Sequence, residues 1–172
     1  RAKDALRSAS GLPGAPCPAT RASITVGRVK PTLLLNVLAL LALTASARAE
    51  IVFEPDLEYA HPGNESLKLN LARPKDAASP LPAIVCIHGG GFRAGTREGY
   101  NGLCIKLAQN GYVAMTVSYR LAPKHQFPAA IHDVKAAVRW ARANAAKYKI
   151  DPDRIGTTGG SAGGHLAQFL AV

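Results

Sequence analysis

The sequence predicts an α/β fold: a doubly wound, mostly parallel sheet that is incomplete at the C-terminus. Two observations predict it. Residues 83–87 and 112–118 are continuous apolar runs of strand length, which are typical of strands buried on both faces of a parallel sheet. Strand patterns also alternate with helix patterns along the chain, and this alternation predicts parallel strands joined by right-handed crossovers.

The elements that precede and follow these two runs complete the expected sheet. Two short segments with partly alternating apolar residues come first and predict antiparallel edge strands. A helix that opens at Pro128 carries apolar residues at helical spacing on one face and His132, Lys135, Arg139 and Arg142 on the other. No aromatic or amide side chain accompanies these bases, so we interpret them as a solvated outer face. In chain order, the predicted elements are strands at 51–59, 66–72 and 83–87, a helix at 99–110, a strand at 112–118, a helix at 128–149, a strand at 154–158 and a helix at 161–172.

Composition excludes several classes of protein. The chain has 172 residues, 48% of them hydrophobic and 19% charged, which excludes a disordered chain. Its formal charge is +10, but residues 1–49 hold seven bases and one acid, whereas residues 50–172 hold fourteen bases and ten acids. Because aromatic residues make up only 6%, the chain offers no stacking platform for single-stranded nucleic acid. We therefore expect no nucleic-acid partner.

The first 49 residues read as a leader. Residues 1–27 lack an apolar period and are expected to be an unstructured leader or a mistranslated upstream segment, since the chain starts at Arg1 rather than Met. Residues 28–49 combine basic residues, an eleven-residue apolar run at 33–43 and a small-x-small site, which predicts a secretory signal peptide cleaved after Ala49. The alternative is an uncut N-terminal anchor. Cleavage would leave residues 50–172 as a secreted or periplasmic protein without a stable membrane span.

Two cysteines, Cys86 and Cys104, would remain after cleavage. They could form one disulfide in an oxidising compartment. Both lie on apolar faces, one in the middle of a predicted strand and one in the middle of a predicted helix. We therefore favour two buried thiols, and the bridge stays an alternative.

A serine motif lies between the last predicted strand and helix. Gly159-Gly160-Ser161-Ala162-Gly163 has the G-x-S-x-G pattern, in which a serine sits on a strained strand-to-helix turn with its hydroxyl at the carboxyl end of the sheet. The adjacent helix N-terminus adds a positive dipole end. The alternative is a glycine-rich helix entry without chemistry.

A second glycine motif, His88-Gly89-Gly90-Gly91, follows the first buried strand. Consecutive glycines let backbone N–H groups turn toward a ligand, and in an acyl-transfer enzyme they would bind the developing oxyanion. A phosphate-binding loop is the alternative, but no G-x-G-x-x-G opens a helix here and no Walker lysine follows. We interpret His88 as an anchor of the loop rather than a catalytic base.

Together these motifs resemble the α/β-hydrolase superfamily, in its hormone-sensitive-lipase-like and carbohydrate (acetyl-xylan or feruloyl) esterase-like branch. The resemblance covers residues 55–172. The supporting segments are residues 88–92 (HGGGF), 119–123 (YRLAP), 127–130 (FPAA) with Asp133, and 159–167 (GGSAGGHLA). It implies a serine esterase acting through an acyl-enzyme on small-molecule or polysaccharide esters, with no cofactor and no metal.

The resemblance also implies roles for single residues. Ser161 would be the nucleophile, and the backbone N–H groups of Gly90, Gly91 and Ala162 would form the oxyanion hole. Our hypothesis for Asp133 is that it braces the loop of Arg120, the alternative being an exposed carboxylate.

The motif also departs from the lipase-like pattern. Gly160 and His165 replace the Asp and Asn that lipase-like relatives often carry. We interpret His165, which points back under the turn, as a packing residue.

The catalytic triad of this fold runs Ser, then Asp or Glu, then His. We therefore expect the acid and the base beyond residue 172, and negligible turnover from this fragment alone. Two other functions stay open. One is an arylformamidase-type amide hydrolase, against which Gly91 argues, and the other is a non-catalytic binding protein on a hydrolase scaffold. The acyl and alcohol groups of the substrate and the oligomeric state also stay open.

Overall fold

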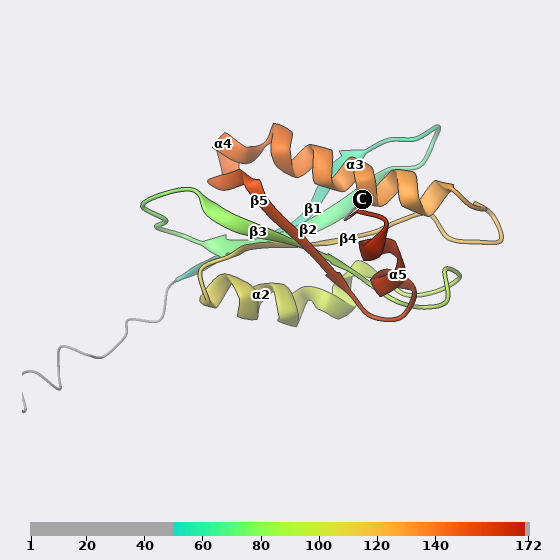
Figure 1. The fold of residues 1–172 in the computed structure, drawn as a ribbon, viewed down its shortest axis with the longest axis horizontal. Helices are drawn as coiled ribbons and strands as arrows, with labels where there is room; N and C mark the ends of the chain where they lie inside the picture. The colour runs from blue at the N-terminus through green and yellow to red at the C-terminus, as the bar shows by residue number, and fades with distance from the viewer. Residues whose placement is uncertain (1–49, 171–172) are drawn as a thin grey trace, which may run out of the picture. The chain divides into compact units, whose positions relative to one another are not determined.

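The computed structural model describes residues 50–170 and contains one mixed sheet of five strands (Figure 1). The predicted leader and signal peptide lie outside the described residues, as does Cys17. The strands are ordered β1-β2-β4-β3-β5 across the sheet. Their bounds are β1 (Ile51–Ala60), β2 (Leu67–Pro74), β3 (Leu81–Ile87), β4 (Val113–Val117) and β5 (Ile150–Gly159).

The three strands nearest the two motifs are parallel, as predicted. β3 lies between β4 and β5 and pairs in parallel with both. β1 and β2 are antiparallel to each other, and β2 is antiparallel to β4. β2 is therefore an inner strand, and the expectation that both antiparallel strands lie at the edge holds only for β1. The reason is burial on both faces, since most of β2 is inaccessible to solvent.

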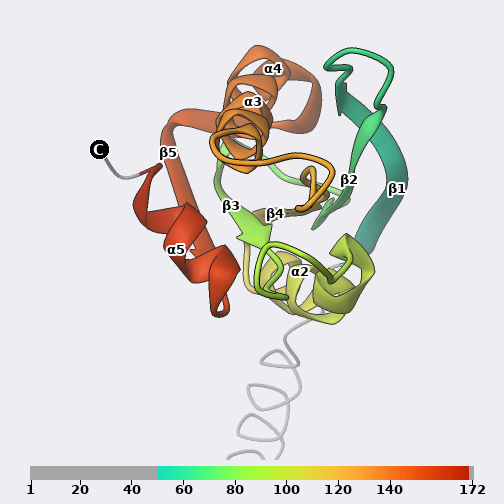
Figure 2. The ribbon, with the colours of Figure 1, turned by 90° about the vertical axis from the view of Figure 1, so that its right-hand side faces the viewer.

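Helices cover both faces of the sheet (Figure 2). α2 packs on one face, and α3 packs on the other together with α5. The helical elements are η1 (Arg97–Tyr100), α2 (Asn101–Gln109), α3 (Ala129–Ala143), α4 (Ala145–Tyr148) and α5 (Ala162–Gln168). Within residues 50–170, no helix is long and apolar enough to cross a membrane.

The predicted helix at 128–149 is interrupted. Asn144 ends α3, and both its backbone N–H and its side-chain amide donate to the carbonyl of Trp140, each at 2.9 Å. A short polar side chain that bonds local backbone in this way competes with helical hydrogen bonds. Lys149 then adopts a left-handed conformation (φ 53°), and Ile150 already pairs with Leu81. β5 thus begins four residues earlier than predicted.

The core follows the alternation of the strands. On the face covered by α3 and α5, alternate residues of β2, β3 and β4 are fully buried. On the opposite face, under α2, lies a smaller cluster that includes Cys86 and Cys104. Both cysteines are buried free thiols, in agreement with the favoured interpretation. The basic side of α3 is exposed to solvent at His132, Lys135, Arg139 and Arg142, as expected of a solvated outer face.

The register of the parallel strands decides where the two motifs meet. Ile87 at the end of β3 pairs with Val117 of β4 and with Gly159 of β5. The loops that follow these three strands therefore leave the sheet at the same edge. These loops are the glycine loop at 88–91, the segment at 118–128 and the serine turn.

Candidate active site

Ser161 occupies a strained turn between β5 and α5. Its backbone has φ 52° and ψ −120°, in a region that non-glycine residues rarely adopt. Two hydrogen bonds close the turn: Gly163 N–H donates to the Gly160 carbonyl at 2.9 Å, and His165 N–H donates to the Ser161 carbonyl at 3.0 Å. Ser161 is exposed to solvent. The strained turn therefore presents a hydroxyl at the carboxyl edge of the sheet, as the G-x-S-x-G pattern predicts.

The glycines on either side of the turn permit backbone-to-backbone contact. A Cβ on Gly163 would lie 2.0 Å from the carbonyl oxygen of Ile87 and 2.7 Å from that of His88. A Cβ on Gly159 would lie 2.5 Å from the carbonyl carbon of Gly163. No side chain fits at either distance, so α5 can start directly against the end of β3 only because both positions lack a Cβ.

The glycine loop lies against the serine. A Cβ on Gly89 would lie 2.7 Å from the Gly160 carbonyl oxygen and 3.4 Å from Ser161 Cβ. Gly90 and Gly91 have φ 123° and 59°, and the Gly90 carbonyl accepts hydrogen bonds from the N–H groups of Arg93 (3.1 Å) and Ala94 (3.0 Å). Among residues 50–170, no acceptor takes the backbone N–H of Gly90, Gly91 or Ala162. The three expected oxyanion donors thus belong to the two backbone segments that meet at Ser161.

His88 anchors the glycine loop from below. His88 is 4% exposed, and its ring stacks on that of Tyr119 with 4.3 Å between the ring centroids. The Tyr119 hydroxyl donates to the His88 carbonyl at 2.9 Å. His88 Nδ1 lies 2.8 Å from the Gly89 carbonyl oxygen, and because a carbonyl only accepts, Nδ1 carries the proton. Burial lowers the pKa of His88, although the bond to Gly89 and the charge of Glu98 act in the opposite direction.

Asp133 of α3 pairs with Arg120, a residue of the segment at 118–128. Asp133 is 2% exposed and accepts from the Arg120 backbone N–H at 2.9 Å. The guanidinium adds Nη2 to Oδ1 at 2.7 Å and Nε to Oδ2 at 3.0 Å. This is the contact that the Asp133 hypothesis requires. The hydrogen bond to Asp133 raises the pKa of Arg120, which keeps the guanidinium charged.

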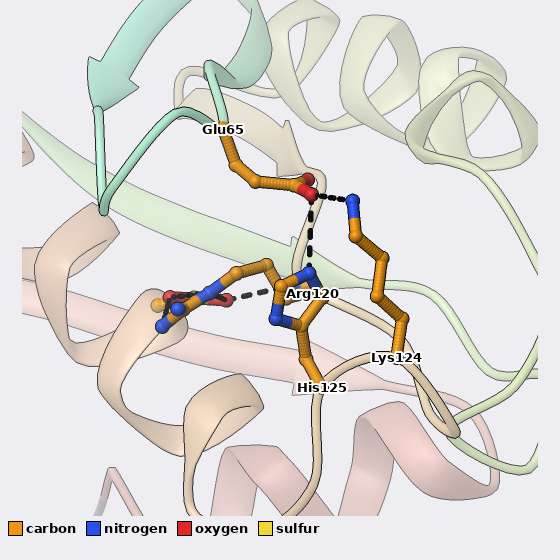
Figure 3. A network of polar contacts seen from close by, with 5 residues as sticks. Glu65, Arg120, Lys124 and His125 are labelled. Carbon is orange, nitrogen blue, oxygen red and sulfur yellow. Dashed lines mark hydrogen bonds and ion pairs between the residues drawn. The ribbon is translucent and has the colours of Figure 1, made fainter.

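The segment at 118–128 also forms ion pairs with the β1–β2 hairpin. Figure 3 shows Glu65 of the hairpin in contact with both Lys124 and His125. His125 Nε2 lies 3.1 Å from Glu65 Oε1. These partners are about sixty positions apart in the sequence, and no local pattern points to the pair. Sequence reasoning therefore missed it.

A mostly apolar cavity of about 280 Å³ lies between the segment at 118–128 and α5, the helix that follows Ser161. His165 lines it, meeting Phe92 edge-on with 5.9 Å between ring centroids and Phe169 with 5.0 Å. His165 is exposed rather than tucked under the turn, which corrects the expectation for this residue. Phe127, 82% exposed, contributes to the rim and was not predicted as a site residue.

Ser161 has no histidine partner in the described part of the chain. None of the histidines between residues 50 and 170 is hydrogen-bonded to its hydroxyl. The same stretch contains no group of three or more His, Cys, Asp or Glu side chains that could hold a metal ion. Ser161 is thus an exposed serine on a strained turn, next to backbone N–H groups of Gly90, Gly91 and Ala162 that have no acceptor within residues 50–170.

The part of the chain that carries this site matches a known protein family. The BD-FAE family model matches residues 69–172, which contain both motifs and the segment between them. The chain belongs to the BD-FAE family. This BD-FAE chain has the α/β-hydrolase fold. It superimposes on the thermophilic esterase Est2 of Thermogutta terrifontis with a TM-score of 0.62 and 36% identity, over 70% of this chain and 43% of that one.

Curated relatives agree with the structural match. The BD-FAE chain is 42% identical to esterase LipC of Mycobacterium tuberculosis over 107 residues, which are 60% of this chain and 26% of the relative. It is 38% identical to ethyl acetate hydrolase of Pseudomonas putida over 119 residues, which are 67% of this chain and 37% of the relative. The chain thus spans about a quarter to a third of the length of these proteins.

We predict that Gly163→Ala disrupts the BD-FAE fold. Its methyl group would collide with the Ile87 carbonyl, so the free energy of unfolding should fall by at least about 2 kcal/mol. Gly102→Ala is the matched control, because a Cβ there meets nothing within 4 Å and α2 gains a better helix former. It should leave stability unchanged or raise it by up to roughly 1 kcal/mol. Urea unfolding measures both, and equal stabilities of the two variants would contradict the packing argument.

We predict that burial of His88 makes stability pH-dependent. Its folded pKa lies below the ordinary value of about 6.5, so the unfolded chain binds the proton more readily. The free energy of unfolding should therefore be fully present above about pH 6.5 and decrease as the pH falls through the folded pKa. His88→Gln, which cannot titrate, should lack this part of the slope in urea unfolding between about pH 7.5 and 5.5. Parallel pH profiles for the two proteins would show that His88 does not contribute.

Proposed function

We propose that the protein is a serine carboxylic ester hydrolase that acts through an acyl-enzyme on Ser161. The observation that carries the proposal is the strained turn of Ser161 held directly against the glycine loop. A non-glycine residue at positive φ persists only where the surrounding structure enforces it, and such residues gather at functional sites. The esterase names of the relatives support the same activity.

The proposed chemistry follows from the groups around the serine. Ser161 Oγ attacks the ester carbonyl carbon, and the carbonyl oxygen becomes an oxyanion that accepts hydrogen bonds from the N–H groups of Gly90, Gly91 and Ala162. Each such donor is worth about 2.7–4 kcal/mol of the barrier. The base of the triad takes the proton of the Ser161 hydroxyl and gives it to the departing alcohol. The same base then takes a proton from water, which attacks the acyl-enzyme and releases the acid and Ser161. We place the acid and base of the triad after residue 172, since in this fold they follow the nucleophile in the chain.

We further propose short-chain or carbohydrate-linked esters as substrates. The Pseudomonas putida relative is named an ethyl acetate hydrolase, and Thermogutta terrifontis Est2 structures are described with propionate and with butyrate bound. The cavity between the segment at 118–128 and α5 is mostly apolar and small, which suits a short acyl or alkyl group. Gln126 is among its lining residues, and its side-chain amide can donate to or accept from a sugar hydroxyl.

We also propose that the protein is exported after removal of residues 1–49. The first strand, β1, starts at Ile51, two positions after the proposed cleavage site at Ala49. A signal peptide cut there would leave the described fold intact.

The complete polypeptide that contains residues 50–172 should hydrolyse p-nitrophenyl acetate, and Ser161→Ala should reduce kcat by about a thousandfold or more. The reason is that no other hydroxyl lies on the strained turn. A panel of methyl ferulate, acetylated xylan and p-nitrophenyl butyrate ranks the substrates. Thermal unfolding is the control for folding. Hydrolysis that survives Ser161→Ala would contradict the proposal, as would an inactive but folded wild-type protein.

Export predicts a defined N-terminus. When the gene is expressed in its own host or in a secreting bacterium, N-terminal sequencing of the exported protein should begin at Glu50. Ala49→Asp should block cleavage, because small residues are required at that site, while Glu50→Gln serves as the control outside the small-x-small motif. Retention of residues 28–49 in the exported wild-type protein would show an uncut anchor instead.

A further inference from the structure

The Tyr100 side chain lies against the glycine that precedes Ser161. The contacts of Gly159, Gly163 and Gly89 described above are made with carbonyl groups and with Ser161 itself. On the remaining side, a Cβ on Gly160 would lie 2.8 Å from the hydroxyl oxygen of Tyr100 and would meet nothing else within 4 Å. The Tyr100 hydroxyl therefore fills the space into which a side chain at position 160 would extend.

Tyr100 is held in place by the element that carries it. It is the last residue of η1, and its ring packs against the apolar cluster under α2. Arg97, at the start of η1, donates from Nε to Asn70 Oδ1 at 2.9 Å and from Nη1 to Ser118 Oγ at 3.0 Å. The Arg97 carbonyl in turn accepts from Thr116 Oγ1 at 2.8 Å. These bonds fix η1 to β2 and to the end of β4.

The placement matters because the turn is strained. A non-glycine residue at φ 52° costs on the order of a few kT. The backbone of Ser161 therefore moves toward a more favourable φ wherever the residues packed against the turn leave space for it. The Gly163 hydrogen bond and the contact with Gly89 hold the Gly160 carbonyl from the backbone, and Tyr100 lies against Gly160. A small relaxation there would move Oγ away from the N–H groups of the glycine loop, and misplacement by about 1 Å costs orders of magnitude in rate.

We propose that Tyr100 is a positioning residue for Ser161. Its hydroxyl occupies the space into which a side chain at position 160 would extend and, because its ring packs against the cluster under α2, holds the Gly160–Ser161 peptide in the conformation that presents Oγ. The steric part of this proposal is independent of the activity, whereas the effect on Ser161 rests on the proposed function. The two parts are therefore tested by separate measurements.

The steric part is tested by a double-mutant cycle on the stability of the complete polypeptide. Gly160→Ala alone should lower the melting temperature by several degrees, because its methyl group meets the Tyr100 hydroxyl. In a Tyr100→Phe background the hydroxyl is absent, and Gly160→Ala should cost little. Equal losses in the two backgrounds would overturn the placement of Tyr100. This cycle gives its answer whether or not the protein is an esterase.

The positioning part is tested by kinetics on the complete polypeptide. Tyr100→Phe should lower kcat roughly tenfold with little change in KM, because the empty space lets the turn relax. The double variant Tyr100→Phe/Gly160→Ala, in which a methyl group refills the space, should recover most of kcat. Tyr112→Phe is the matched control, because Tyr112 precedes β4 at the end of the strand away from the serine turn. Its kcat should equal that of the wild type.

Each kinetic outcome has one meaning. If the wild type hydrolyses esters and Tyr100→Phe retains its kcat, the positioning role is wrong. A fall in kcat that the added methyl group does not recover also overturns it, because a merely packed tyrosine would behave in that way. If the folded wild type shows no Ser161-dependent hydrolysis, the proposed function fails, and the stability cycle still decides where the Tyr100 hydroxyl lies.

Discussion

The site depends on one contact between two pieces of backbone: the start of α5 against the end of β3. Gly163 lies so close to the Ile87 carbonyl that no Cβ fits between them. This contact brings the serine turn to the glycine loop, since the loop begins one residue after Ile87. It also forces Ser161 into its strained conformation, because the chain must reverse from strand to helix within two residues. The same contact therefore packs α5 against the sheet and presents the Ser161 hydroxyl.

The loops around this contact are fixed by buried polar groups. His88 is stacked on Tyr119 and bonded to its own loop, and Asp133 holds Arg120 through both backbone and guanidinium. Each polar group is paired, so its burial is not penalised by a lost hydrogen bond. These contacts hold the loops in one arrangement. Such an arrangement suits the oxyanion stabilisation that we propose, which works best when donors need no rearrangement during the reaction.

Much of the fold and part of the site could be predicted from local patterns. The two apolar runs identified β3 and β4, and the G-x-S-x-G pattern located the turn of Ser161 with its strained backbone. Local patterns failed where distant segments meet. The interruption at Asn144, the exposed position of His165 and the pairing of Glu65 with His125 each depend on packing that short sequence windows do not contain. The relation of Tyr100 to Gly160 is of the same kind, because the two residues are sixty positions apart in the sequence.

By itself, the sequence determined the type of each element, the parallel arrangement of the central strands and the identity of the presented serine. These follow from periodicity and from glycine, whose missing side chain has consequences that can be read one position at a time. Only the tertiary structure decided which groups surround that serine. Strand register brings the ends of β3, β4 and β5 to one edge, and a register is set by contacts across the whole sheet. The neighbours of Ser161 are therefore a property of the assembled sheet rather than of any segment.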